Sequence, residues 1–287
     1  MAYPSNNNTD INSELYANFV AQAEFAAYEN SVARALCRVI EVPFNAGKVV
    51  QVPVWASITA QVITDEAAAT AKTTNTTAPT ITLDEHVVYN QVTDMLRDSS
   101  YGDVMGQLAD QSGRAIGESY DTMAFGKFSS FSSDLGSTST ELTADLILKA
   151  AATLRTRKLT GPFYAVVHPG QAYNIKKQLT YVAQTNVPAL SNVGNDILSA
   201  YYIGSIGGVN VIESSLLTAV TTGGANAFVS GVFASSALGI AERGGLDLNT
   251  LYLPAQRATD MVLKAVAGAA VIQSTHGVAI TAEADLD

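Results

Sequence analysis

The chain has 287 residues, of which 47% are hydrophobic and only 15% are charged, and its formal net charge is −10. This acidic balance argues against sequence-independent binding of nucleic acid, which needs a basic surface, but an acidic wall that repels phosphate is compatible with enclosing nucleic acid. The apolar content suffices for one large domain or two smaller ones. The charged fraction is below the roughly 25% of ordinary soluble domains, which fits either a surface that becomes covered or a low-charge monomer.

Cys37 is the single cysteine, so no intrachain disulfide can form, and its apolar neighbours predict a buried, inert thiol. The polar start of the chain, residues 1–8, lacks the basic and apolar regions of a signal peptide. No stretch reaches the roughly 18 apolar residues of a membrane span. We therefore expect a soluble protein made inside a cell, with no membrane contact.

The N-terminal part is expected to begin with a flexible arm over residues 1–10. Asp10 then caps a helix, whose apolar side has spacings of three and four: Ile11, Leu15, Phe19, Ala23 and Ala26. Residues Val39–Val54 read as extended chain, in which Pro43 and Pro53 suit edge positions.

Residues 66–79 consist largely of Ala and Thr and cannot build a core of their own. They are bracketed by two strand-like runs, Ser57–Ile63 and Thr80–Val92, which together predict a long two-stranded hairpin. An isolated hairpin is marginal in water, so this one would lie on something else, such as a neighbouring subunit. The alternative is a disordered surface loop.

A long amphipathic helix is expected next, capped by Ser99 or Ser100. Its apolar face is marked by well-spaced residues: Val104, Leu108, Ala115, Ile116 and Met123. Gly106, Gly113 and Gly117 lie inside it, where they allow another backbone to approach closely, or else the helix breaks near Gly113. The run Ser129–Thr140 is of low complexity and predicts a linker or loop and a domain boundary.

Mixed helix and strand follow this break. A helical stripe runs over Leu142–Leu154, Phe163–Val167 is a strand, His168-Pro169-Gly170 is a turn, and Ala172–Leu179 is a helix. Further strands are expected in five short apolar runs: Gly208–Ile212, Ala227–Phe233, Ala237–Ala241, Asp260–Ala267 and Ala269–Ser274. A turn at His276-Gly277 leads into Val278–Ile280. The fold class is therefore α+β.

No pattern in the sequence supports catalysis, a metal or a cofactor. His86, His168 and His276 lack partners at ligand spacing, there is no phosphate-binding or dinucleotide loop, and no Gly-x-Ser-x-Gly elbow is present. His168 at the end of a strand is the best catalytic candidate, but a structural turn histidine is the simpler interpretation. We therefore expect no catalytic, cofactor-binding or metal-binding residues and no cofactor, and we expect that the protein is not an enzyme.

The order of parts resembles the major capsid proteins of tailed double-stranded DNA bacteriophages, the HK97-type fold family. Five stretches carry this resemblance: Ala56–Val92, Tyr101–Phe125, Phe163–Tyr173, Gly204–Leu217 and Arg257–Ile280. The first is similar to the E-loop of that family and the second to its spine helix. The third resembles the strand–turn–helix unit of the axial domain, and the fourth resembles the glycine turn and strand of the same domain. The fifth resembles the closing strands of the peripheral domain. Lys72 is the one lysine between Trp55 and Val92, but partners for the cross-link seen in some members are not identifiable, and cross-linking is not predicted.

The resemblance implies an N-terminal arm at 1–55, an E-loop hairpin at 56–92, a peripheral domain at 93–140 and 251–287, and an axial domain at 141–250. It implies a major capsid protein that self-assembles, as pentamers and hexamers, into an icosahedral shell around viral double-stranded DNA. Expected partners are copies of the chain, portal, scaffolding and possible cement proteins, and weakly contacted DNA; the location is the virion, after synthesis in the host cytoplasm. An encapsulin-like nanocompartment and a soluble α/β enzyme remain the alternatives.

Overall fold

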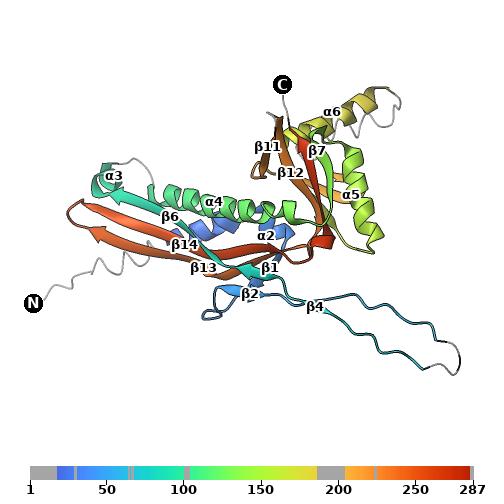
Figure 1. Cartoon of the computed structure of the whole chain (residues 1–287). Helices are drawn as coiled ribbons and strands as arrows, with labels where there is room; N and C mark the ends of the chain where they lie inside the picture. Colours follow the sequence, from blue (N-terminus) through green and yellow to red (C-terminus); the bar gives the residue numbers. More distant parts are fainter. Residues whose placement is uncertain are drawn as a thin grey trace, which may run out of the picture.

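The computed structural model describes residues 18–28, 31–63, 65, 68–99, 104–185, 204–222 and 225–284. The expected arm at 1–10, the Asp10 cap and Ser100 lie outside these residues. Figure 1 shows an elongated sheet with a helix along it, a more compact sheet at one end, and a hairpin that projects away from both. No helix among the described residues is long and apolar enough to cross a membrane.

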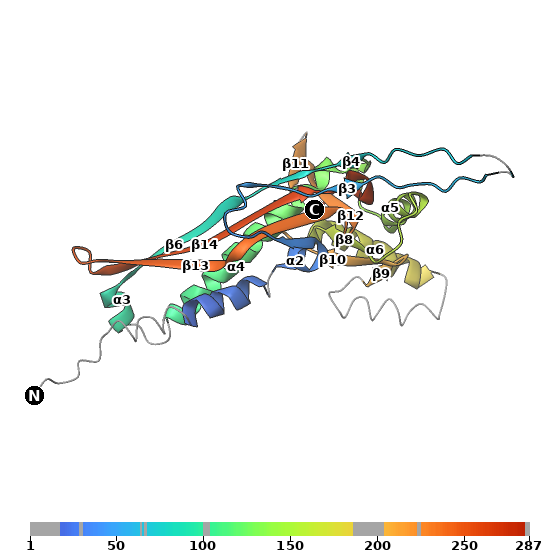
Figure 2. The same cartoon turned by 90° about the horizontal axis from the view of Figure 1, so that it is seen from below.

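The elongated sheet has four strands in the order β1-β13-β14-β6. Their bounds are Arg38–Glu41, Leu238–Leu253, Ala258–Val271 and Asp84–Thr93, respectively. β14 pairs antiparallel with both β13 and β6, and β1 runs parallel to the first part of β13. The helix α4 (Val104–Phe125) covers one face of this sheet, and the helix of residues 18–28 lies beside α4 (Figure 2).

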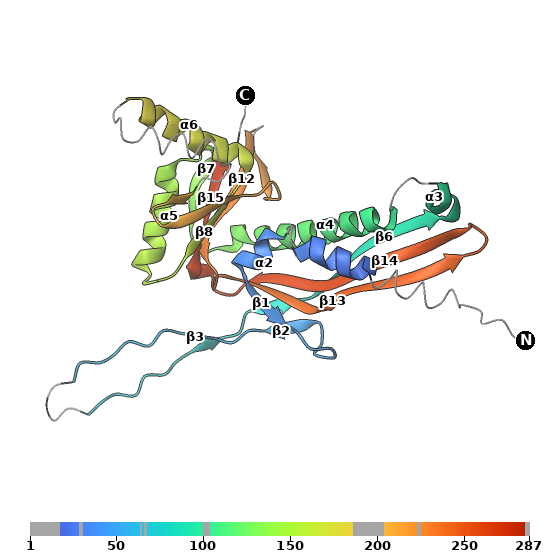
Figure 3. The ribbon, with the colours of Figure 1, turned by 180° about the vertical axis from the view of Figure 1, so that it is seen from behind.

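The compact sheet has seven strands. Six follow the order β7-β15-β12-β8-β10-β9, and β11 pairs with β12. Their bounds are β7 (Asp134–Glu141), β15 (Gly277–Glu283), β12 (Ala225–Ala234), β8 (Phe163–Val167), β10 (Val209–Glu213), β9 (Ser205–Ile206) and β11 (Ala219–Thr222). Two helices, α5 (Ala144–Thr156) and α6 (Pro169–Thr185), accompany this sheet (Figure 3).

The remaining elements are short. They are the helices α2 (Val32–Leu36) and α3 (Asp94–Ser99), the 3-10 turns η1 (Phe128–Ser130) and η2 (Ser274–His276), and the hairpin strands β2 (Val49–Gln51), β3 (Val54–Trp55), β4 (Thr76–Thr77) and β5 (Thr80–Thr82).

An aromatic cluster joins the two sheets into one core. Phe128 stacks on Phe125 with ring centroids 5.4 Å apart, and it contacts Phe233 of β12 at the same distance. Leu238 and Ile240 of β13 are buried in the same cluster. Because aromatic pairs add to the free energy gained by burial, this cluster ties the end of α4 to both sheets.

Several expected elements are confirmed. β8 spans Phe163–Val167 as expected, and α5 buries Ile147, Ala150 and Leu154 of the expected stripe. α4 is continuous through Gly113, so the helix does not break there. Ile116 lies on its buried face, whereas Ala115 is exposed because it lies on the opposite side of the helix.

The low-complexity run Ser129–Thr140 is not a linker, and that prediction is wrong. Asp134–Glu141 forms β7, which runs parallel to β15 at the edge of the compact sheet. Leu135 packs against the core while most of the strand is exposed. A polar Ser/Thr sequence is compatible with an edge strand because only its backbone has to pair.

Other boundaries also differ. Ser99, expected to precede the long helix, is instead the last described residue of α3, where its Oγ donates to the carbonyl of Met95. Pro169 begins α6, since proline suits the first helical turn, where its missing N–H costs nothing.

The strands of the elongated sheet are longer than expected. β13 continues far beyond Ala241, and β14 runs through Gly268 without a break. The expected domain division between residues 250 and 251 therefore falls inside β13, and β15, expected with the peripheral domain, lies in the compact sheet.

Candidate assembly surfaces

The base of the hairpin is formed by paired strands and packs against the elongated sheet. β2 pairs with β5, and β3 pairs with β4. Ile81 and Leu83, at the base, are almost completely buried. A Cβ at Gly268 of β14 would lie 2.1 Å from the carbonyl oxygen of Thr82, so only glycine lets this strand of the hairpin cross the sheet so closely.

The hairpin is confirmed, but its strands are not those expected. Ser57–Ile63 forms no strand, and Thr80–Val92 divides at Leu83, so that β5 belongs to the hairpin and β6 to the elongated sheet. Beyond β3 and β4 the two arms are extended, and the described contacts between them include side-chain bonds from Gln61 to Thr70 and from Lys72 to Thr59. Over residues 57–63 and 68–75, which the structure describes, the arms form no ladder of backbone bonds of the kind that defines a sheet.

The projecting part of the hairpin carries exposed apolar side chains. Trp55 and Ile58 are each 70% exposed, and Val62 is fully exposed. Figures 1 and 3 show that this part extends well away from both sheets. Exposed apolar side chains on a long, weakly paired hairpin are typical of a surface that another molecule covers.

The N-terminal helix packs backbone against backbone on α4. A Cβ at Gly113 would lie 2.2 Å from the carbonyl oxygen of Ala23, and one at Gly117 would lie 2.8 Å from that of Ala27. Phe19, Ala23 and Ala27 are buried there. The expectation that glycines on this helix allow close approach is therefore confirmed at these two positions.

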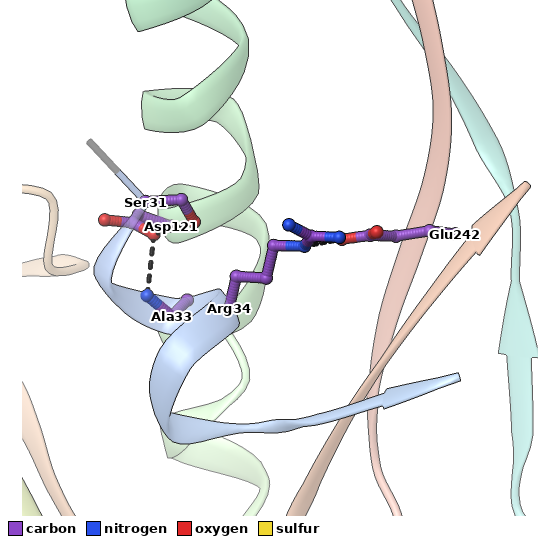
Figure 4. Close-up of polar contacts among 5 residues, drawn as sticks. All are labelled: Ser31, Ala33, Arg34, Asp121 and Glu242. Carbon is purple, nitrogen blue, oxygen red and sulfur yellow. Dashed lines mark hydrogen bonds and ion pairs between the residues drawn. The ribbon is translucent and has the colours of Figure 1, made fainter. Parts of the chain in front are cut away.

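A buried carboxylate continues the same face of α4, four residues after Gly117. Asp121 is 2% exposed and accepts hydrogen bonds from Ser31 Oγ (2.8 Å), Ala33 N (2.9 Å) and Val32 N (3.1 Å). Figure 4 shows Ser31 and Ala33 beside Asp121. Burial raises the pKa of Asp121 above its usual range, and these three hydrogen bonds oppose that shift.

An ion pair joins α2 to the elongated sheet beside this contact. Arg34 Nε lies 3.0 Å from Glu242 Oε1, and the guanidinium lies 3.6 Å from the centre of the Tyr28 ring. Glu242 is nearly buried and Arg34 partly so. Burial and a hydrogen bond to Glu24 raise the pKa of Tyr28 to about 12. A cavity of about 490 Å³ opens here, lined in part by these four side chains.

The residues weighed for chemistry are not brought together. His86 bonds to Ser119 (2.7 Å) and His276 to Ser236 (2.7 Å), while His168 stacks on Phe228 with ring centroids 3.8 Å apart. Within the part of the chain that the structure describes, no group of three or more His, Cys, Asp or Glu is placed to hold a metal ion.

Burial shifts the pKa values of two of these histidines and of the cysteine. Burial lowers the pKa of His168, and burial together with Arg157 lowers the pKa of His276. Cys37 is buried as expected, and burial raises the pKa of its thiol to about 12. A thiol held protonated in this way is a poor nucleophile.

Sequence reasoning missed Asp121, Ser31 and Arg34. The signal was the spacing of Gly113, Gly117 and Asp121, which places a carboxylate on the same helix face as two glycines. The partners of that face lie about 90 positions away in sequence, so no local pattern identifies them.

The described residues combine an α+β fold with a projecting hairpin that exposes large apolar side chains. A family model described as phage capsid protein matches residues 78–285. The chain therefore belongs to the phage capsid protein family and is a shell protein of a phage capsid, located in the virion. A search of curated proteins by sequence found no match.

Solved capsid structures share the fold. The capsid of cyanophage P-SCSP1u is 15% identical, with 88% of each chain covered and a TM-score of 0.68. The capsid of Ralstonia phage GP4 is 12% identical, covering 87% of this chain and 88% of that one, with a TM-score of 0.68. The head of Helicobacter pylori bacteriophage KHP40 is 11% identical, covering 90% and 91%, with a TM-score of 0.69. These likenesses support an α+β capsid fold, and they do not favour the encapsulin or enzyme alternatives.

Proposed function

We propose that the chain is the HK97-type major capsid protein of a tailed phage and that it assembles through its hairpin and N-terminal segment. Rings of five and six copies close into an icosahedral shell around double-stranded DNA, which the acidic protein contacts weakly and without sequence preference. Portal, scaffolding and possible cement proteins complete the particle, and the chain is made in the host cytoplasm. The protein works by burial and interdigitation rather than by catalysis.

The parts of the chain are assigned within this proposal. The N-terminal arm, expected at 1–55, ends before β2, α4 is the spine helix of the peripheral domain, and the axial domain corresponds to the compact sheet. Two pairings support moving the expected boundaries. β13 pairs with β14 nearly along its whole length, which favours placing residues 238–253 in the peripheral domain. The pairing of β2 with β5 favours an E-loop of residues 49–82.

The exposed hairpin is the observation that carries the proposal. Trp55, Ile58 and Val62 project from the body, and burying an apolar side chain of this size contributes about 1.5–3 kcal/mol. In a closed shell this gain repeats at every copy, so contacts that are weak singly become sufficient together.

Cross-linking with mixed isotopes tests whether the hairpin lies on a neighbour. Particles are assembled from equal parts of isotopically light and heavy chain and treated with a lysine-reactive cross-linker. Lys72 is expected to link to lysines of the body in light–heavy pairs as often as in like pairs, because those links join different copies. Links of Lys72 that are confined to light–light and heavy–heavy pairs show instead that the hairpin folds back on its own chain.

A further inference from the structure

The helix α2 is capped by a residue of another helix. Its N-cap residue Ser31 has the extended backbone of a cap (φ −83°, ψ 108°), yet its side chain makes no capping bond. A serine at this position ordinarily accepts a hydrogen bond from the second or third backbone N–H of its own helix. Here Ser31 Oγ donates to Asp121, which accepts from Val32 N and Ala33 N in its place.

The stability of α2 alone does not account for this arrangement. A hydroxyl at the N-cap can accept from one of these N–H groups without removing a carboxylate from water, which is expensive. Asp121 is almost completely buried, and its upward-shifted pKa indicates that desolvation outweighs its three hydrogen bonds. What a carboxylate from α4 adds is a fixed connection between two segments about 90 residues apart in sequence.

Together with two neighbouring contacts, this connection holds the N-terminal segment in place; we call the three contacts the clamp. Gly113 and Gly117 hold the preceding helix against α4, and Asp121 holds the start of α2 on the same face. Arg34 then joins α2 to Glu242 of β13 from the other side (Figure 4). Phe25, on the outer side of the helix of residues 18–28, is 69% exposed, so the clamp determines where this apolar side chain is presented.

We propose that Asp121 is a positioning residue for shell assembly, which fixes the orientation in which the N-terminal segment meets a neighbouring copy of the chain. This inference rests on the proposed shell function. It assigns to Asp121 a role that separates from helix stability, because a cap supplied by α2 itself stabilises that helix without tying it to α4.

Two variants separate the two roles. Asp121→Ala removes both the cap and the connection to α4. Ser31→Asp combined with Asp121→Ala restores a strong N-cap within α2, since aspartate is among the preferred residues there, and uses the space that the alanine leaves. Glu118→Ala is the matched control, because it removes an exposed carboxylate one turn before Asp121 that accepts none of the three hydrogen bonds made by Asp121.

Each variant is compared with wild type by thermal unfolding of the subunit and by electron microscopy of assembly products. We expect Asp121→Ala to unfold at a lower temperature and to yield open or irregular products. The double variant is expected to recover much of the unfolding temperature and still yield irregular products, while Glu118→Ala forms wild-type particles. If Asp121→Ala is insoluble, Asp121→Asn takes its place; because it keeps the volume and one acceptor oxygen, changes in the same directions but of smaller size are expected.

Two results overturn the inference. Wild-type particles from the double variant show that stability of α2 is all that assembly needs, and wild-type particles from Asp121→Ala show that the connection is dispensable. A wild-type chain that forms no particles under any condition contradicts the shell function itself and is thereby distinguished from a failure of this inference.

Discussion

Gly113→Ala tests the packing of the N-terminal helix on α4. Replacing glycine by alanine inside a helix ordinarily stabilises it by about 1 kcal/mol. Here the new Cβ would lie 2.2 Å from the backbone oxygen of Ala23, which is ~1 Å inside the separation at which non-bonded atoms attract best. A backbone atom cannot rotate away, so the whole N-terminal helix has to shift.

The expected loss follows from these two opposing contributions. Overpacking of a filled site costs about 1–3 kcal/mol, and a clash with backbone belongs at the upper end. Subtracting the gain in helix propensity leaves a net loss of about 2 kcal/mol in the free energy of unfolding. Gly117→Ala places its Cβ 2.8 Å from the oxygen of Ala27, so its loss is expected to be smaller.

Chemical denaturation of the soluble subunit measures these losses, and hydrogen exchange over residues 18–28 reports whether the helix detaches. Gln111→Ala, on the exposed side of α4, is the control and is expected to change stability by no more than about 0.5 kcal/mol. A Gly113→Ala subunit that is as stable as wild type, with unchanged protection of residues 18–28, refutes the close packing described above.

Three further predictions concern the hairpin, the thiol and the histidines. Replacing residues 57–74 by a two-residue turn removes the projecting arms but keeps the pairing of β3 with β4, so subunits should fold normally by circular dichroism and form no closed shells in electron micrographs. Cys37 should resist a thiol-reactive dye in the native subunit and react fully in denaturant, because burial keeps its pKa near 12; rapid native labelling contradicts its burial. Burial lowers the pKa values of His168 and His276 below the ~6.5 of an unfolded chain, so the unfolded state takes up protons first and stability should fall as the pH drops through ~6.5. His168→Phe, which keeps a ring against Phe228, should show a weaker fall, and an identical pH profile would speak against this origin.

Local patterns were sufficient where one segment determines its own structure. The continuous apolar run Phe163–Val167 predicts a buried strand, and it forms β8 at the centre of the compact sheet. The stripe through Ile147, Ala150 and Leu154 predicts α5 because helical periodicity is strong over three turns.

Local patterns failed where the partner lies far away in sequence. Asp134–Glu141 is a strand only because β15 presents an edge to it, and its Ser/Thr sequence resembles a loop. The hairpin register depends on Ile81 and Leu83 entering the core beneath β14, which no spacing reveals. Asp121 is polar on a buried face, and its reason for being there is the N-terminus of a helix that precedes it by about 90 residues.

Light scattering combined with negative-stain electron microscopy on the purified chain, alone and with a candidate scaffolding protein, tests the central claim most directly. The account predicts closed particles, or rings of five and six copies that close when scaffold is added. A monomer or dimer that persists under every condition contradicts assembly through the hairpin and the N-terminal segment.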